Sequence, residues 1–369
     1  MKKVLFTSKN LEIGGMEKAL LALINSLADT KKYQITLLLE EKKGVLLNNL
    51  NSSINVEEYK VSRCRFAFLR KAINFSHRFF WKLKNKNKYD FACCYATYSR
   101  ICNKLTRIAS TNNLLYVHSN YYDYYNHNAD LVKKLFDELN ISKFTKVAFV
   151  SNEAKQGIAT VYPELYDNFV VINNIFNYKS IESKMYEKVN YQKDKEKSLF
   201  LFVGRLEEES KQITRLIKAV DITKNFSDKF EVLIIGDGMN EEEYEKLIDD
   251  KNLNQYIKML GSRENPYPYY LLADYIILVS NFEGFPVIYN EALFLNKPVL
   301  TTINCSDDAI NIGTDLGIIM EKDPEDISKK MLDAISNKLQ VKLKKVDYKE
   351  INNKRLKAIC NLIEGDRNE

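Results

Sequence analysis

The sequence predicts two doubly wound, Rossmann-like α/β domains that face a central cleft. The chain has 369 residues, which suits two domains that each bury a core of their own. Short apolar runs alternate with helical patterns twice along the chain, as the strands of a parallel sheet alternate with crossover helices. Between the two series, residues 178–197 are charged and poor in aliphatic side chains, which predicts a linker.

The first series gives the elements of an N-terminal domain, expected at residues 1–177. A strand is predicted at residues 3–7, followed by a helix at 17–27 whose leucine and isoleucine residues recur at helical spacing. The remaining patterns of this half predict strands at 34–39, 91–95, 114–117 and 147–150, and a helix at 130–139.

The second series gives a C-terminal domain, expected at residues 198–341. It opens with a strand at 199–203 and a helix with apolar side chains at i, i+3, i+4 and i+7 from Ile213. Strands are then predicted at 231–235, 257–260, 275–279 and 298–302, and helices at 241–250, 267–272, 287–295 and 324–336. Residues 342–369 form a polar, helical tail that is free to pack back on the N-terminal domain.

Composition and missing motifs exclude several classes of protein. A chain that is 45% hydrophobic and 28% charged reads as soluble, and no apolar run reaches the length of a membrane span. The apolar run at the N-terminus is too short for a signal peptide, so we expect a cytoplasmic protein. Six cysteines without CxxC spacing, and the lack of an Asp-x-Asp triplet, predict no metal and no other cofactor. The absence of P-loop, GxSxG and GxGxxG motifs argues against an NTPase, a hydrolase and a dehydrogenase.

The net charge of +6 is concentrated in one stretch, from Lys60 to Lys88. This stretch carries ten Lys or Arg residues and no acid, so the rest of the chain is net negative. Large aromatic residues lie within it: Phe66, Phe68, Phe75, Phe79, Phe80 and Trp81. Two interpretations remain open, peripheral contact with an anionic membrane and a solvated helix whose aromatics face the core. No nucleic-acid motif accompanies the stretch, which argues against nucleic acid as a partner.

Several candidate ligand-binding residues follow predicted strands, where doubly wound sheets bind their ligands. Gly14 and Gly15 precede the first helix, whose free N–H groups suit an anion. Arg205 and Lys211 follow strand 199–203 and suit a diphosphate, although the neighbouring acids Glu207–Glu209 offer them other partners. The other strand-end candidates are Gly236, Gly261, Arg263 and His118.

The segment from Glu283 to Glu291 combines two carboxylates with a helix start. Glu283 is expected at a strand end and Glu291 one to two turns into the next helix, where both can accept hydroxyl hydrogen bonds. Pro286 marks the helix entry, where free backbone N–H groups favour phosphate or sugar oxygens. The other residues of this candidate wall are Gly284, Phe285, Val287 and Ile288.

Taken in order, these pieces resemble the retaining GT-B-fold glycosyltransferases often called family four. The resemblance spans nearly the whole chain and rests on the ordered set more than on any one piece. The pieces are Gly14-Gly15-Met16-Glu17-Lys18, His118, Val150-Ser151-Asn152, Val171-Ile172-Asn173-Asn174, Phe202-Val203-Gly204-Arg205-Leu206, Lys211, Ile235-Gly236-Asp237-Gly238, Leu260-Gly261, Asn265-Pro266-Tyr267-Pro268-Tyr269, Glu283-Gly284-Phe285-Pro286, Glu291-Ala292 and Lys297-Pro298-Val299.

The resemblance implies a role for each matching position. The N-terminal domain would take the acceptor and the C-terminal domain a nucleotide sugar, most simply a UDP-sugar. Arg205 and Lys211 would hold the donor diphosphate, and Glu291 the ribose. Glu283 and the N–H groups after it would hold the transferred sugar, with Gly15 near the phosphate and His118 near the reacting centre. It also implies metal-free transfer of a hexose or acetamido-hexose, with retention, to a glycan or lipid-linked acceptor in the synthesis of a bacterial surface polysaccharide.

The sequence departs from the family pattern at three places. Gln212 and Asn296 stand where the family commonly has glycine. Residues 304–310 lack the family's glycine-rich turn and later glutamate, which leaves the donor sugar unassigned. Two other functions stay open: a non-catalytic GT-B partner that scaffolds another transferase, and a nucleotide-sugar epimerase.

Overall fold

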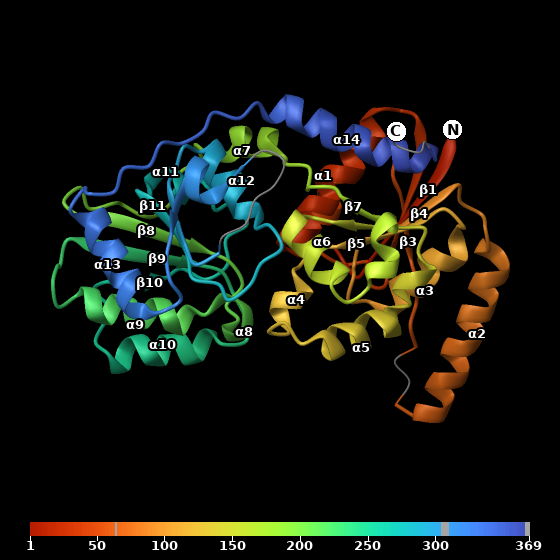
Figure 1. Ribbon diagram of the computed structural model, residues 1–369, viewed down its shortest axis with the longest axis horizontal. Coiled ribbons are helices and arrows are strands. Elements are labelled where there is room, and N and C mark those ends of the chain that lie inside the picture. Colours follow the sequence, from red (N-terminus) through yellow and green to blue (C-terminus); the bar gives the residue numbers. More distant parts are fainter. Residues whose placement is uncertain (63–64, 304–309, 366–369) are drawn as a thin grey trace. The chain divides into compact units, whose positions relative to one another are not determined.

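The structure is a computed structural model that describes residues 1–62, 65–303 and 310–365. The chain divides into two compact units, Met1–Phe176 with Lys349–Glu369, and Asn177–Tyr348. Each unit contains one sheet, and every strand pair within the two sheets is parallel. Helices alternate with the strands along both parts of the chain (Figure 1). The predicted α/β class with two parallel sheets is confirmed.

The sheet of the first unit has the strand order β3-β2-β1-β4-β5-β6-β7. Strand β1 pairs on both sides, with Val4 opposite Ile35 of β2 and Phe91 of β4. Two strands escaped the sequence analysis, β3 because it is short and polar and β7 because it has three residues. The strands are β1 (Lys2–Ser8), β2 (Tyr33–Leu39), β3 (Asn55–Glu58), β4 (Phe91–Cys94), β5 (Asn113–Val117), β6 (Lys146–Phe149) and β7 (Phe169–Val171).

The first unit also contains the last helix of the chain. The Lys2 ammonium donates to the carbonyl of Ile363 at 3.3 Å, and the Arg355 guanidinium donates to the carbonyl of Asn174 at 2.6 Å. These bonds join the end of the chain to β1 and to the segment after β7. The helices are α1 (Gly15–Asp29), α2 (Ala67–Asn85), α3 (Arg100–Ala109), α4 (Tyr121–Tyr124), α5 (Ala129–Leu139), α6 (Asn152–Ala159) and α14 (Tyr348–Glu364).

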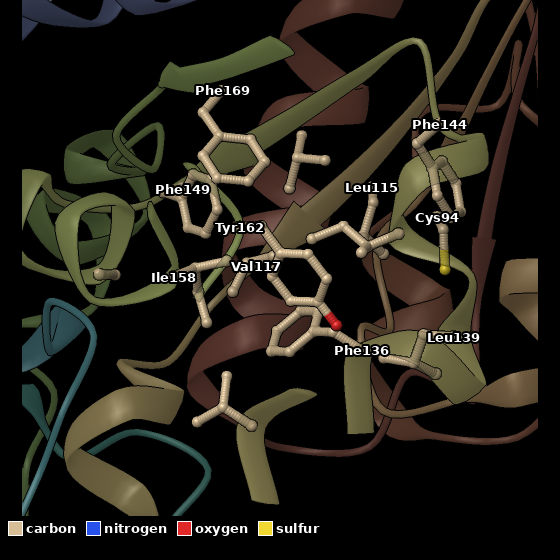
Figure 2. Packing of buried hydrophobic residues seen from close by; sticks show 14 of the residues in the cluster. Cys94, Leu115, Val117, Phe136, Leu139, Phe144, Phe149, Ile158, Tyr162 and Phe169 are labelled. Atoms are coloured by element: carbon tan, nitrogen blue, oxygen red, sulfur yellow. The ribbon is translucent and has the colours of Figure 1, made fainter. Parts of the chain in front are cut away.

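A buried cluster between strands β5 and β6 and helices α5 and α6 supports the candidate residues of the first unit (Figure 2). Phe149 and Phe169 meet edge to face with ring centroids 5.1 Å apart, and Phe136 is fully buried in the same cluster. Complete burial of a side chain of this size contributes about 1.5–3 kcal/mol. The cluster therefore fixes the end of β5, which is followed by His118.

The sheet of the second unit has the order β10-β9-β8-β11-β12-β13. Its strands are β8 (Ser198–Val203), β9 (Phe230–Ile235), β10 (Ile257–Met259), β11 (Tyr275–Leu278), β12 (Val299–Thr301) and β13 (Gly317–Ile319). Its helices are α7 (Tyr178–Lys184), α8 (Glu208–Lys211), α9 (Ile213–Thr223), α10 (Glu241–Asp250), α11 (Tyr267–Leu272), α12 (Val287–Phe294) and α13 (Pro324–Ile335). The segment predicted as a linker thus opens with a helix, α7, that the sequence analysis missed.

The strand order reverses between β1 and β4 in the first unit and between β8 and β11 in the second. The loops on the two sides of such a reversal diverge and leave a crevice beyond the carboxyl ends of the strands. In the second unit, these are the loops after β8 and β11. They carry Arg205 and Lys211 on one side and Glu283 on the other. The topology therefore directs these candidate residues to one edge of the sheet.

Two glycines of the second unit give a stability test, because they separate steric overlap from backbone strain. Both have positive φ, 154° at Gly236 and 66° at Gly261. A Cβ atom on Gly236 would overlap the carbonyl oxygen of Gly204, whereas one on Gly261 would meet open space. Gly261→Ala should lower the free energy of unfolding of this unit by about 1–2 kcal/mol. Gly236→Ala should lower it by more than about 3 kcal/mol. Urea unfolding followed by circular dichroism measures both, and equal losses would contradict the overlap.

Candidate functional site

The side chains of Lys211 and Glu283 form an ion pair in the second unit. Lys211 ends α8, and its ammonium donates to Oε1 of Glu283, to which the hydroxyl of Ser280 also donates at 2.9 Å. The lysine and glutamate side chains are only 21% and 15% exposed. Two residues that are 72 positions apart in the sequence therefore meet at the edge where the topology predicts a ligand crevice.

Arg215 of α9 supports the loop that carries Glu283. Its guanidinium donates to the carbonyl of Val279 at 2.6 Å and to Oδ1 of Asn281 at 2.7 Å. The backbone N–H of Asn281 donates to the carbonyl of Ser210 at 2.8 Å, which joins this loop to α8. Sequence analysis missed Arg215 and Ser280, because Arg215 stands inside an amphipathic helix pattern and a serine beside a loop is common.

Arg205 remains available to an anionic ligand. Its side chain is 67% exposed, and its nearest guanidinium nitrogen lies 3.8 Å from Oε2 of Glu207. An exposed pair of this kind contributes about 0–1 kcal/mol. Glu208 bonds to the Tyr244 hydroxyl at 2.9 Å instead, and Lys211 bonds to Glu283. The acids Glu207–Glu209 therefore do not pair with Lys211, and Arg205 forms only a weak pair with one of them.

Glu291 is buried in α12, and two tyrosines of α11 donate to its carboxylate. The Tyr270 hydroxyl donates to Oε2 at 2.7 Å, and the Tyr267 hydroxyl to Oε1 at 3.4 Å. Burial and the nearby Glu291 charge both raise the pKa of these tyrosines, so the hydroxyls stay protonated and donate. A carboxylate has about four acceptor positions, so Glu291 can also accept from a ligand hydroxyl. Sequence analysis assigned no role to either tyrosine.

The residues around the start of α12 lie as the sequence predicts. Pro286 is the N-cap residue, and the helix begins at Val287. Gly284, Phe285 and Ile288 are buried, so the side chains of this segment pack inward while the helix start stays at the sheet edge. The N–H group of Tyr289 in the first turn donates to the carbonyl of Pro286 at 3.1 Å, whereas the N–H groups of Val287 and Ile288 precede the first intrahelical bonds and suit phosphate or sugar oxygens.

Arg263 lies in the loop after β10 beside a pocket of about 400 Å³. Leu260, Asn265 and Tyr269 line the pocket together with residues 187–190. The loop reaches the neighbouring strand end, because the N–H of Gly236 donates to the carbonyl of Gly261 at 3.1 Å. The volume falls in the usual range for small-molecule pockets, about 300–1,000 Å³.

The remaining candidates belong to the first unit. Gly14 is the N-cap residue of α1, and a Cβ atom there would collide with the carboxylate of Glu17. Gly15 is the first residue of α1. Because Glu17 occupies the first turn of the helix and is buried, a carboxylate already lies where an anion was expected.

The imidazole of His118 follows β5 and packs between two buried tyrosine rings. Its ring centroid lies 4.2 Å from that of Tyr95 and 4.7 Å from that of Tyr116. Both ring nitrogens are shielded from solvent, and neither has a hydrogen-bond partner within the described ranges. Burial lowers the pKa of His118 to about 3, and the nearby backbone of Tyr95 opposes this shift without reaching hydrogen-bonding geometry. The ring is therefore neutral near pH 7.

Two of the departures from the family pattern are accommodated by the backbone. Gln212 has φ 54° and Asn296 has φ 56°, so both residues adopt the left-handed conformation in which the family's glycines would be unstrained. Asparagine tolerates this conformation better than most residues, so the change at Asn296 is mild. Residues 304–309 of the third departure lie outside the described residues.

Within the described ranges, no group of three or more His, Cys, Asp or Glu side chains is placed to hold a metal ion. The absence of a cofactor stays a prediction. None of the helices in those ranges is long and apolar enough to cross a membrane.

The shifted pKa of His118 predicts how stability depends on pH. Between pH 6.5 and 3 the unfolded chain binds a proton at this residue and the folded chain does not. The free energy of unfolding is therefore unaffected by this residue above pH 6.5. Below pH 6.5 it decreases as the pH falls, by up to about 1.4 kcal/mol per pH unit. Urea unfolding of the first unit, followed by the fluorescence of Trp81, measures this slope.

His118→Asn should remove this slope, because asparagine does not titrate. His127→Asn removes an exposed imidazole of the same unit and should keep it. An unchanged slope in His118→Asn would contradict the assignment.

Comparisons with known proteins agree with this architecture. The family model described as "Glycosyl transferases group 1" matches residues 184–353, which is most of the second unit. An uncharacterized glycosyltransferase of Methanocaldococcus jannaschii, MJ1059, is 25% identical over 43% of this chain, and the match spans 40% of that protein.

A Campylobacter jejuni protein is 23% identical over 91% of this chain and 89% of its own length. It is named GalNAc-alpha-(1->4)-GalNAc-alpha-(1->3)-diNAcBac-PP-undecaprenol alpha-1,4-N-acetyl-D-galactosaminyltransferase. Among solved structures, Anabaena Alr3699/HepE in complex with UDP and glucose has a TM-score of 0.70 at 16% identity, covering 98% of this chain and 95% of that one. The chain thus has two parallel sheets of the GT-B fold, and residues 184–353 of it match the family model of the group 1 glycosyltransferases.

Proposed function

We propose that the chain transfers a hexose or acetamido-hexose from a nucleotide sugar, most simply a UDP-sugar, to a glycan or lipid-linked acceptor. We further propose that it retains the anomeric configuration and acts in the synthesis of a capsule or related surface glycan. The observation that carries the proposal is the half-buried Lys211–Glu283 pair at the edge of the second sheet. The relatives support the choice of substrates, since one is named for a transfer onto a PP-undecaprenol glycan and a structural neighbour binds UDP and glucose.

The pair suits a donor that carries both negative charge and hydroxyl groups. Lys211 is a cation held at a fixed place, and Glu283 is an acceptor for sugar hydroxyls. When a glycosyl bond breaks, negative charge develops on the departing diphosphate. A preorganised cation stabilises that charge more than it stabilises the bound substrate, which is how it raises the rate. Arg205, exposed nearby in sequence on the same loop, adds a second cation for the diphosphate.

The other candidates complete the proposed donor site. Glu291, oriented by Tyr270 and Tyr267, would accept hydrogen bonds from the ribose. The pocket beside Arg263 would take the base. The roles that the resemblance implies for His118, Gly14 and Gly15, which belong to the first unit, stay predictions.

Substitution of the ion pair tests this function. Lys211→Ala should lower kcat/KM for sugar transfer by about 100- to 1,000-fold, because the cation that faces the leaving group is lost. Glu283→Gln should mainly impair use of the sugar and leave binding of free UDP in place. Release of UDP in the presence of a lipid-linked acceptor measures both.

The matched control is Lys224→Ala, which breaks a half-buried ion pair with Asp221 at the other end of α9. It should keep full activity. Unchanged turnover in Lys211→Ala would contradict the role of the ion pair. No turnover by the wild-type protein would favour the non-catalytic scaffold, and conversion of the sugar nucleotide without acceptor would favour the epimerase.

A panel of UDP-, GDP- and ADP-sugars tests the choice of donor. The true donor should stabilise the second unit by about 2.7 kcal/mol at a concentration of 100 times its Kd, while the others should stabilise it less. Thermal unfolding measures the shift. A flat response to the whole panel, together with no turnover, would refute the proposed function.

A further inference from the structure

Helix α2 exposes a continuous apolar face. Of the seventeen large hydrophobic side chains that are exposed within the described residues, eight lie between positions 66 and 83. Phe68 is 83% exposed, and Phe80 and Leu83 are each 67% exposed. The full set is Phe66, Phe68, Leu69, Ile73, Phe75, Phe79, Phe80 and Leu83. Scattered exposed hydrophobics are normal in a folded protein, but a contiguous group of this size marks an interaction surface.

The other face of α2 is more polar, and it is the one that contacts the first unit. Asn74, Arg78, Trp81 and Asn85 stand at i, i+4, i+7 and i+11, and these residues are half-buried or buried. Oδ1 of Asn74 accepts from the N–H of Ser62 at 2.7 Å. Trp81 meets Tyr59 edge to face at 6.3 Å and packs against the core beside Leu105 of α3.

The orientation of α2 is therefore the reverse of that of an ordinary surface helix, which buries its apolar stripe. Figure 1 shows α2, in orange, at the outer edge of the first unit beside α3. One interpretation of residues 60–88 was that their aromatic side chains face the core. It is wrong for the phenylalanines, which are exposed, and it is correct only for Trp81.

Positive charge borders the apolar face on both sides. At about 100° per residue, Lys71 and Lys82 fall on one border and Lys84 on the other. Residues 60–88 contain no acid that could neutralise these lysines locally. Two cations of α3, Lys104 and Arg107, add to this charge. Burial lowers the pKa of Lys104, and the positive charges nearby, including those of Arg78 and Lys82 on α2, lower it further. Repulsion among these groups is relieved when an anionic surface approaches.

We propose that α2 is a membrane-binding helix that lies in the plane of an anionic bilayer surface. Phe68, Phe75 and Phe79 would enter the boundary between headgroups and acyl chains, while the bordering lysines bind headgroup phosphates. The combination of Phe and Leu on one face, lysines at its borders and low overall hydrophobicity is that of an interfacial helix. With nineteen residues, the helix is about 28 Å long and lies along the surface.

Charge decides between a membrane and a second copy of the chain as the occupant. Two copies that meet through α2 would bring two acid-free basic segments together, whereas an anionic bilayer supplies the opposite charge. This inference does not depend on the proposed reaction, and it is tested without turnover.

Vesicle flotation tests the binding. The protein should float with vesicles of phosphatidylcholine and phosphatidylglycerol, bind pure phosphatidylcholine at least 10-fold more weakly, and release from the anionic vesicles in high salt. Phe75→Ser with Phe79→Ser, and separately Lys71→Glu with Lys82→Glu, should each reduce binding to anionic vesicles at least 10-fold. Phe226→Ser and Lys229→Glu make the same chemical changes at exposed positions of the second unit and should leave binding unchanged.

A fluorescence experiment tests the orientation of the helix, because Trp81 is the only tryptophan of the chain. Lipids brominated in the acyl chains should quench a tryptophan on the outer face, in Phe79→Trp with Trp81→Phe. They should leave the native Trp81, which packs against Tyr59, much less quenched.

Three results would overturn the inference: equal flotation of the wild-type protein and the Phe75→Ser, Phe79→Ser variant, equal quenching of the two tryptophans, or binding that ignores lipid charge. Concentration-dependent dimers that the phenylalanine substitutions abolish, in a protein that does not float, would assign the face to a second copy. Because the substituted side chains are exposed, the variants should unfold at the wild-type temperature, and circular dichroism checks this.

Discussion

Parallel pairing is the constraint on which the rest of this structure depends. Because every strand pair in the two sheets is parallel, all carboxyl ends in a sheet lie at one edge, and each connection must cross back to the other edge. The strand order places β8 between β9 and β11. Loops that are distant in the sequence, such as those carrying Lys211 and Glu283, are thereby brought within bonding distance. The hydrogen bonds of Arg215 then hold the second loop in place.

The ion pair at this edge has an electrostatic consequence. A half-buried lysine and glutamate stabilise each other, so neither is left as an unpaired charge at a partly desolvated site. If the proposed donor binds here, its diphosphate would compete with Glu283 for the lysine, and its sugar hydroxyls would compete with the lysine for Glu283. Breaking the pair would free both partners together, which would couple recognition of the phosphate to recognition of the sugar. Glu291 is held in the same way by tyrosine hydroxyls, which orient the carboxylate without neutralising it.

Helix α2 shows how packing can invert the usual amphipathic arrangement. Its apolar side chains outnumber its polar ones on the exposed face, while Asn74 and Asn85 turn toward the protein. The inward contacts depend on single hydrogen bonds and on Trp81, and they leave most of the helix surface in water. Such a helix adds little to the stability of the first unit. Its exposed apolar face is therefore better explained by the proposed contact with a bilayer surface.

The sequence by itself determined the α/β class, most strands, and the motif positions at strand ends. Apolar runs with sharp ends, such as residues 199–203, and helical periodicity, such as that from Ile213, are local signals that survive in any tertiary context. It failed for β3, β7 and β13, which are too short or too polar to show a pattern, and for α7, whose charged residues imitate a linker.

Only the tertiary structure decided which side chains meet. The pairing of Lys211 with Glu283, the tyrosine hydroxyls on Glu291, and the burial of both His118 nitrogens depend on segments far apart in the chain. It also decided the direction in which α2 faces, because an amphipathic pattern gives two faces without saying which one is turned toward the protein. Periodicity is a property of one segment, whereas contact is a property of two.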